Sequence, residues 1–137
     1  MFTSLDISTT GLTAQRARMD VIAGNIAMAD VTEDASGAPN PYRRRFVVFQ
    51  PGSELGKDTG VQVAKIREDP SQFHLKYDPG HKDAIQSGPQ AGHVRYPNID
   101  VNLEYIDAME AARAYEANLA AYDLGKAMIT SSLRILA

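Results

Sequence analysis

The sequence contains no cysteine and no tryptophan among its 137 residues. Without cysteine, disulfide bonds and thiolate metal sites are excluded. This absence suits a protein that ends outside the cytoplasm, although many cytoplasmic proteins share it. No apolar run approaches the roughly 20 residues that a membrane-spanning helix needs. We therefore expect no direct insertion into a membrane.

The chain also has little net charge, because 14 basic residues stand against 17 acidic ones. Residues 1–30 carry −1, residues 31–100 carry 0 and residues 101–137 carry −2. Nucleic acids and anionic membranes are bound by basic surfaces, and no basic half is present here. We therefore expect no nucleic-acid partner.

The start of the chain lacks the pattern of a cleavable signal peptide. The first basic residue is Arg16, and the polar residues Asp6, Ser8 and Thr9 interrupt the stretch that should be apolar. If the protein leaves the cytoplasm, we expect it to do so without cleavage of its N-terminus.

The last third of the chain has the clearest pattern. Residues spaced alternately three and four apart form one stripe, which Lys126 alone interrupts, and the mean repeat of 3.5 is typical of a coiled coil. Leu119 lies on this stripe, whereas Asn118 and Asp123 fall outside it. We therefore expect Leu119→Asp to block assembly and Asn118→Asp to have a mild effect. The stripe consists of Val101, Tyr105, Ala108, Ala112, Tyr115, Leu119, Tyr122, Lys126, Ile129, Leu133 and Leu136.

A helix over about 101–136 would be about 50 Å long and would need another long helix beside it. The first 30 residues supply a candidate with the same rhythm, weakened by two polar residues on the stripe and by nearby glycines. The partner could be this helix of the same chain or a helix of a neighbouring chain, and the pattern leaves both open. The second stripe consists of Leu5, Ser8, Leu12, Gln15, Met19, Ile22, Ile26 and Ala29.

Between the two helices the pattern changes to short strands and turns. Residues 43–50, 61–66, 73–77 and 94–96 have the β-branched, aromatic or alternating content of strands. The sequence thus predicts an α+β fold in which long N- and C-terminal helices form a coiled-coil pair. Residues 1–32 and 101–137 would form the helical domain, and residues 33–100 a small β-rich outer module.

Motifs that could carry chemistry are sparse. Asp58-Thr59-Gly60 matches the triplet of aspartic proteases, but the chain has no second triplet, and we interpret it as a polar turn. Asp78, His81 and Asp83, with His74 or His93, could meet a metal ion, but their spacing matches no metal motif and favours a solvated turn. Arg43–Arg45 is interpreted as a solvated strand edge. We expect no catalytic residue, no cofactor and no metal site.

The segments Met19–Ile22, Asn25–Ala27 and Ala108–Asn118 resemble the flagellar rod and hook proteins, and the last of them is similar to the C-terminal helix of that family. The resemblance covers nearly the whole chain. The family usually continues Asn25–Ala27 with further Asn and Thr, where this chain has Met28, Asp30 and Val31. The other similar segments are Leu5–Ser8, Gly11–Arg16, Pro41–Phe49, Tyr77–His81 and Tyr96–Val101.

The resemblance implies a structural subunit of the proximal rod of the bacterial flagellar basal body, in the periplasm. Such subunits are exported by the flagellar type III apparatus, join copies of themselves and other rod proteins in a helical assembly, and transmit torque from motor to hook. It also implies terminal helices that become ordered on assembly, so protease should remove roughly residues 1–30 and 105–137 of the isolated chain.

The residues predicted to contact other subunits are the apolar members of the two stripes. A free-standing helical adaptor or chaperone-like protein is the alternative, and such a protein should be folded without self-association. The predicted interface residues are Leu5, Leu12, Met19, Ile22, Ile26, Tyr105, Ala108, Ala112, Tyr115, Leu119, Tyr122, Ile129, Leu133 and Leu136.

Overall fold

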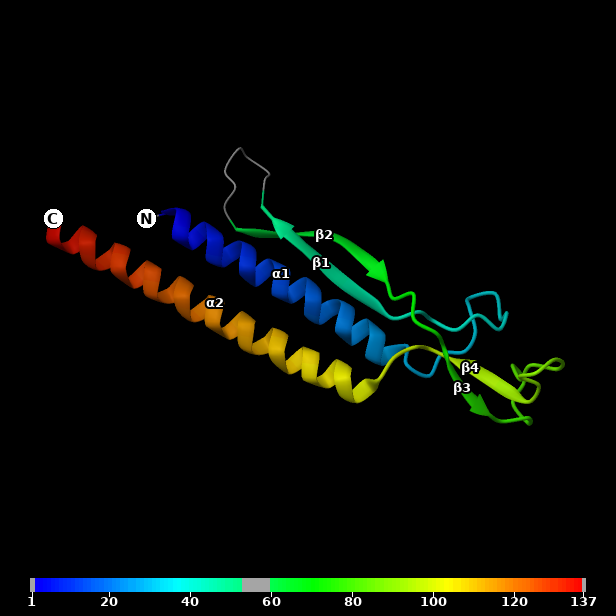
Figure 1. Ribbon diagram of the computed structural model, residues 1–137. Helices are drawn as coiled ribbons and strands as arrows, with labels where there is room; N and C mark the ends of the chain where they lie inside the picture. Colours follow the sequence, from blue (N-terminus) through cyan, green and yellow to red (C-terminus); the bar gives the residue numbers. More distant parts are fainter. Residues whose placement is uncertain (1, 53–59, 137) are drawn as a thin grey trace.

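The computed structural model describes residues 2–52 and 60–136. Two long helices, α1 (Phe2–Ala27) and α2 (Val101–Leu136), lie side by side and antiparallel, so the start of α1 and the end of α2 lie at the same end of an elongated molecule (Figure 1). Four strands lie between them in sequence. The α+β fold with paired terminal helices is confirmed.

The helices approach each other closely where one of them has glycine. Gly11 of α1 lies under the side chain of Asn118, whose Nδ2 atom would be 2.9 Å from a Cβ at position 11. Gly125 of α2 lies under Leu5 in the same way, with the leucine Cδ2 atom 2.9 Å from where a Cβ at position 125 would be. The glycines that weaken the helices as isolated segments therefore bring them together as a pair.

Strands β1 (Arg45–Pro51) and β2 (Val61–Glu68) form an antiparallel hairpin that lies along α1, on the side away from α2 (Figure 1). A bulge between Val48 and Phe49 shifts the register, so Ala64 has no partner on β1. The hairpin is attached to α1 near its start, where the backbone N–H of Val61 donates to the hydroxyl of Thr10 at 3.1 Å. Helix α1 is therefore covered on two sides.

Strands β3 (His74–Tyr77) and β4 (His93–Tyr96) form a second antiparallel hairpin at the end of the molecule where α2 begins (Figure 1). The four described strands thus form two separate two-stranded sheets. Helix α2 then begins with Asp100 as its cap, since the Asp100 Oδ1 atom accepts from the backbone N–H of Asn102 at 2.9 Å.

The buried apolar core is small for a chain of this length. It consists mainly of short side chains, and large apolar side chains are more often exposed, above all on α2. No described helix has the length and hydropathy to cross a bilayer. The fold therefore leaves much apolar surface for contact with other proteins. The buried apolar residues are Ala14, Ile22, Ala84, Val94, Ile99 and Ala111.

Candidate assembly surface and buried polar junction

Two rows of α2 residues, each with a spacing of seven, lie on the side of α2 that packs on α1. All members of both rows are buried or half-buried. We call these two rows the inner seam. The first row is Glu104, Ala111, Asn118, Gly125 and Ser132, and the second is Ala108, Tyr115, Tyr122 and Ile129.

The predicted stripe contains the second row but not the first. In place of the first row it has residues one position further along, so it is rotated by about 100° there. Its large members Tyr105, Leu119 and Leu133 are 55%, 41% and 62% exposed. The prediction that Asn118 lies outside the helix contact is wrong, because Asn118 covers Gly11. We call Tyr105, Ala112, Leu119, Lys126 and Leu133 the outer row.

The predicted residues of α1 lie where the helix meets its neighbours. Ile22 is buried, and Leu5, Leu12, Met19 and Ile26 are half-buried. The side chain of Leu136 lies outside the described residues. The predicted residues of α1 therefore pack mostly within the chain, whereas α2 has a large exposed apolar surface.

That surface is extensive. Nine large apolar side chains of α2 are exposed, which is more than an isolated helical pair would carry in water. They lie on the outer row and on the faces turned away from α1. They are Leu103, Tyr105, Ile106, Met109, Leu119, Leu124, Met128, Leu133 and Ile135.

Where α1 ends and α2 begins, a buried polar junction joins both helices to β1. Asn25 and Glu104 are both 0% exposed. The Asn25 amide donates to the Glu104 Oε2 atom at 3.0 Å and to the backbone oxygen of Arg45 at 2.8 Å, and its own oxygen accepts from the Arg45 backbone N–H at 3.0 Å. Asn25 thus bonds β1 as a neighbouring strand would.

The charge of Glu104 is balanced by Arg44. The Arg44 Nε atom donates to Glu104 Oε1 at 2.6 Å, and its Nη2 atom donates to Asp107 at 3.2 Å. A carboxylate buried without a partner would be very costly, so these contacts are required for Glu104 to occupy this place. The interpretation of Arg44 as part of a solvated strand edge is wrong.

The junction continues into the segment between β2 and β3. The backbone N–H of Arg44 donates to Asn98 at 2.9 Å, and the Asn98 amide donates to the Ser71 hydroxyl at 2.7 Å. Hydrogen bonds from the Ser71 backbone and side chain lower the pKa of Asp69, and the charges of Arg44 and Arg43 act in the same direction against burial. Residues from four parts of the chain are therefore held at one point.

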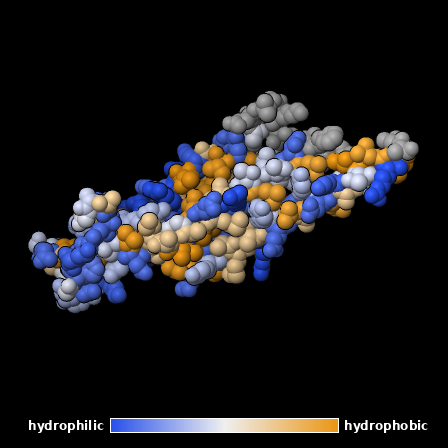
Figure 2. Space-filling view, turned by 180° about the vertical axis from the view of Figure 1, so that it is seen from behind, coloured by the Kyte–Doolittle hydropathy of each residue, from blue (hydrophilic) through white to orange (hydrophobic). Residues whose placement is uncertain are grey.

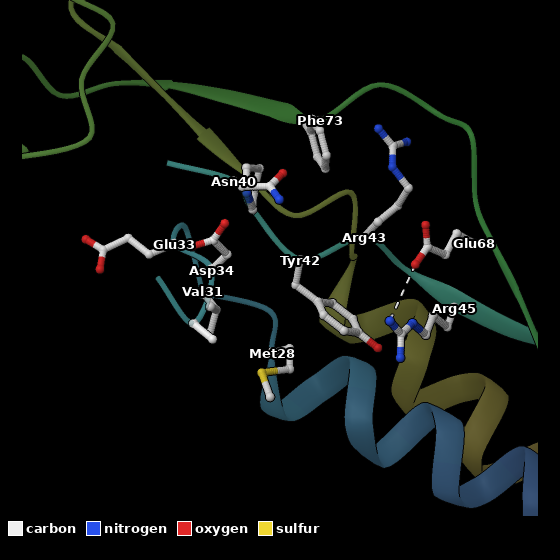
Figure 3. A pocket seen from close by; sticks show the side chains of 12 residues that line it. Met28, Val31, Glu33, Asp34, Asn40, Tyr42, Arg43, Arg45, Glu68 and Phe73 are labelled. Atoms are coloured by element: carbon white, nitrogen blue, oxygen red, sulfur yellow. Dashed lines mark hydrogen bonds and ion pairs between the residues drawn. The ribbon is translucent and has the colours of Figure 1, made fainter. Parts of the chain in front are cut away.

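A groove of about 640 Å³ lies beside the junction at the end of α1 (Figure 3). Met28, 42% exposed, lines this groove at the end of α1, with Tyr42 nearby. Arg43 lies over the Phe73 ring at 4.3 Å and donates to the backbone oxygens of residues 69 and 71. Arg45 pairs with Glu68 at 3.4 Å. The guanidinium groups of Arg43 and Arg45 are therefore engaged within the chain.

The remaining candidate motifs have structural partners. His81 Nδ1 accepts from the backbone N–H of Asp83 at 3.1 Å, and Asp83 accepts from the hydroxyl of Thr32 at 2.8 Å. Among the described residues, no three histidine, aspartate or glutamate side chains gather as a metal site would require. Asp58 and Thr59 lie outside the described residues.

The buried polar junction was not predicted from the sequence. Its members are separated by up to 79 positions, so no local spacing connects them. Two signals were present: an asparagine inside an apolar helical stretch, and an acidic residue in the first turn of α2 near the stripe. Neither signal identifies the partners of these residues, because the partners come from other elements.

Residues 5–33 match the family model of the flagella basal body rod protein, which covers most of α1. The chain is 40% identical to the flagellar basal-body rod protein FlgC of Borreliella burgdorferi, over 99% of this chain and 97% of that protein. It is 38% identical to FlgC of Bacillus subtilis over 98% and 97%, and 37% identical to FlgC of Escherichia coli O157:H7 over 95% and 93%.

The chain belongs to the FlgC family of flagellar basal-body rod proteins. Its relatives are structural proteins of the rod. The paired terminal helices and the exposed apolar surface of α2 agree with a protein that is built into an assembly.

Proposed function

We propose that this chain is a structural subunit of the proximal flagellar rod, where α1 and α2 lie in an inner helical layer and the hairpins face outward. The observation that carries the proposal is the outer row of α2. Tyr105, Leu119 and Leu133 of that row are exposed large apolar side chains that adjoin the inner seam, with the half-buried Ala112 and the exposed Lys126 between them. A helix with two adjacent rows of contact residues can pack against α1 on one side and a further helix on the other.

The partners in this proposal are copies of this chain and other rod subunits, joined head to tail in a helical assembly. The rod lies in the periplasm and passes torque from motor to hook, and the chain has no enzymatic role. A heterologous assembly of this kind needs two different surfaces on each subunit. The outer row of α2 supplies one of them.

The decisive experiment replaces Leu119 by aspartate. Because Leu119 is exposed in the single chain, the Leu119→Asp protein should keep its fold, yet a charge buried in a subunit contact costs several kcal/mol. The variant should therefore accumulate normally and fail to enter the rod, with loss of motility. Basal-body composition and swimming of the variant strain measure this.

Ala120→Asp is the matched control. It adds the same charge one residue later, on the side of α2 turned away from α1, at an exposed position. We expect it to swim nearly as the parent does. Equal behaviour of the two strains would mean that the outer row is not a subunit contact.

Export is a separate part of the proposal. We expect residues 1–25 to be required for passage through the flagellar type III apparatus. The support is the match of residues 5–33 to the family model of rod proteins, which covers most of this segment. Secretion of the chain by cells that carry a deletion within residues 5–25 tests it, and export at the parent's level would contradict it.

A further inference from the structure

The side chain of Asn25 occupies the free edge of β1. Its amide nitrogen donates to the backbone oxygen of Arg45 at 2.8 Å, and its oxygen accepts from the Arg45 backbone N–H at 3.0 Å. Two residues that face each other in an antiparallel sheet exchange the same two bonds. On its other side β1 is paired with β2, and the backbone N–H of Asp69, just after β2, donates to the Arg44 oxygen at 2.8 Å. Asn25 therefore lies where a residue of a third strand would pair.

The edge continues beyond Asn25 along an apolar strand. The backbone groups of successive residues point to opposite edges of a strand, so Val47 is the next residue whose N–H and C=O lie on the same edge as those of Arg45. The segment Phe46–Phe49 contains only aromatic and β-branched residues, which favour association between strands when they are exposed. A groove of about 320 Å³ lies between this segment and Ile22 of α1. Among the described strands only β2 pairs with β1, so helices take the place of a strand along this edge.

The free edge of β2 is protected in a different way. Its residues Lys65 and Arg67 are exposed, and charged residues on an edge strand oppose pairing with other chains. The segment Phe46–Phe49 has no charge of its own, although Arg43–Arg45 precede it and Pro51 follows it, as residues that limit association often do. The edge of β1 therefore depends on α1 for its protection.

Helix α1 holds the hairpin at both of its ends. Asn25 bonds the start of β1, and the Thr10 hydroxyl accepts from the backbone N–H of Val61 at the start of β2, at 3.1 Å. At 1.5 Å per residue, Thr10 and Asn25 are about 22 Å apart along α1. A strand with the length of β1 spans about 20 Å. The two bonding residues of α1 thus match the length of the hairpin, and loss of order in α1 would release both ends.

The surroundings of the hairpin favour association once its edge is free. In the space-filling view, hydrophobic residues gather over the helices and the β1–β2 hairpin, whereas the end formed by β3 and β4 is mainly hydrophilic (Figure 2). An opened edge of β1 would therefore lie within an apolar surface, and such surfaces are sites of contact with other proteins.

We propose that Asn25 covers a strand-pairing edge of β1, and that this edge, once released, pairs antiparallel with β1 of a second copy of this chain. The backbone groups of Val47 favour a pair centred on that residue. Phe46 then lies opposite Val48, and Arg45 lies opposite Phe49, so no like charges face each other. The order of α1 thereby decides whether the chain can associate through its strands. The inference does not depend on the place of the chain in the rod.

Amide hydrogen exchange at Val47 measures the state of this edge. A synthetic peptide with the sequence of residues 44–50 represents the strand of a second copy and is added to the full chain. A second peptide carries an N-methyl group on the residue that corresponds to Val47, so it lacks the donor at the centre of the pair. Asn25→Ala removes both bonds to Arg45. Asn25→Ser keeps a hydroxyl donor beside Glu104 but is too short to bond both backbone groups.

We expect the first peptide to slow exchange of the Val47 amide several-fold in both Asn25 variants and to leave the parent unchanged. The N-methylated peptide should have no effect. The amides of Phe46 and Val48 face β2, so they are internal controls and should exchange slowly throughout. Thr10→Val removes the bond at the other end of the hairpin and should behave as the parent does, because Asn25 is still in place.

Sedimentation tests whether the second strand comes from another copy. The Asn25 variants should show an additional concentration-dependent species, and a further Val47→Pro substitution should remove it. Proline is tolerated on an edge strand where its missing N–H does not bond the neighbouring strand, as is the case for Val47 and β2. A species that persists with Val47→Pro, or no additional species at all, would overturn the pairing of two copies.

The remaining outcomes also decide the inference. Equal protection of Val47 in the parent and in the Asn25 variants, or in response to both peptides, would overturn it. Protection of β2 amides instead would place the pairing edge on the other strand. Loss of fold in both Asn25 variants, seen by circular dichroism, would make Asn25 a general stabiliser of the junction and would likewise overturn the inference.

Discussion

The side chain of Asn118 lies directly over Gly11, so closely that a Cβ atom at position 11 would be 2.9 Å from its Nδ2 atom and 3.0 Å from its Cγ atom. This contact sets the distance between α1 and α2 near the middle of the pair. A distance set by glycine is sensitive to the addition of a single methyl group.

Gly11→Ala should therefore not show the gain in stability that replacement of glycine by alanine normally gives a helix. Gly24→Ala is the control, because a Cβ there would meet nothing within 4 Å. We expect Gly24→Ala to stabilise the isolated chain by about 0.5–1 kcal/mol. Gly11→Ala should be neutral or destabilising, since the gain is offset by displacement of Asn118. Urea unfolding followed by circular dichroism measures both.

A double substitution separates the contact from other effects at position 11. In the Asn118→Ala background the obstacle is gone, so Gly11→Ala should regain the helix-forming benefit. If Gly11→Ala stabilises the parent chain as much as Gly24→Ala does, the close approach of the two helices at this position is incorrect.

Removal of the buried charge should have a much larger effect. Glu104 has a side chain 1% exposed and is bound to Arg44 and Asn25, so Glu104→Ala would leave both donors without their acceptor. We expect a loss of about 2–4 kcal/mol in the free energy of unfolding, below the upper range for buried pairs because the Arg44 side chain is 26% exposed.

The matched control for this change is Glu110→Ala. Glu110 also pairs with an arginine across the helix pair, Arg18 at 3.4 Å, but its side chain is 67% exposed. Exposed ion pairs contribute little, so the loss should stay within about 1 kcal/mol. Similar losses for the two glutamates would show that the junction does not hold the helices to β1.

The pH dependence of stability should include a contribution from Asp69. Hydrogen bonds from Ser71 hold the pKa of Asp69 below its usual range in the folded chain. The Asp69 carboxylate therefore stabilises the fold at pH values above the ordinary aspartate pKa of about 3.9. This contribution disappears as the pH falls through the lowered pKa of Asp69 in the folded chain. Asp69→Asn should reduce the acid dependence of the melting temperature in that interval.

Asp20→Asn, at an exposed position of α1, removes one carboxylate of the same type elsewhere and is the control for net charge. The melting temperatures of the parent and Asp69→Asn should approach each other toward the acid end of the interval. An unchanged difference at every pH would exclude the titration of Asp69 as the cause.

Limited proteolysis of the isolated chain should begin at the end where the two termini meet. At that end the large apolar side chains of Leu133 and Ile135 are 62% and 85% exposed, whereas the opposite end of the pair is held by the polar junction. Local unfolding is easiest where buried contacts are fewest. We expect early cuts in residues 129–136 and later cuts toward residue 105, identified by mass spectrometry over time.

Because β1 and β2 lie on α1, the hairpin should become susceptible when α1 is lost. The β-containing fragment expected from the sequence would then be short-lived. Early cleavage near Asn25 or Glu104, with an intact C-terminus, would contradict the proposed order of opening.

The sequence by itself determined the two long helices, the α+β class and the family resemblance. The 3.5-residue repeat of α2 and the alternation near Leu75 depend only on local periodicity, and periodicity decides the type of an element. The start of α2 at Asp100 was also predictable, because a cap acts on the residues directly after it.

Only the tertiary structure decided which rows of α2 face α1. Tyr115 and Tyr122 belong both to the predicted stripe and to the observed inner seam. The 3.5-residue repeat is therefore compatible with either Asn118 or Leu119 as the residue that packs beside them. The choice depends on close approach, which Gly11 and Gly125 permit only where they meet Asn118 and Leu5. A stripe that is defined by hydrophobic residues leaves out such small and polar residues.

The buried junction depended on the tertiary structure for a different reason. Asn25, Arg44 and Glu104 are each ordinary polar residues in sequence, and their burial is tolerable only because each satisfies the others. That mutual satisfaction is a property of three elements placed together by the fold. It has no periodicity and no fixed spacing, so it could not be predicted from the chain alone.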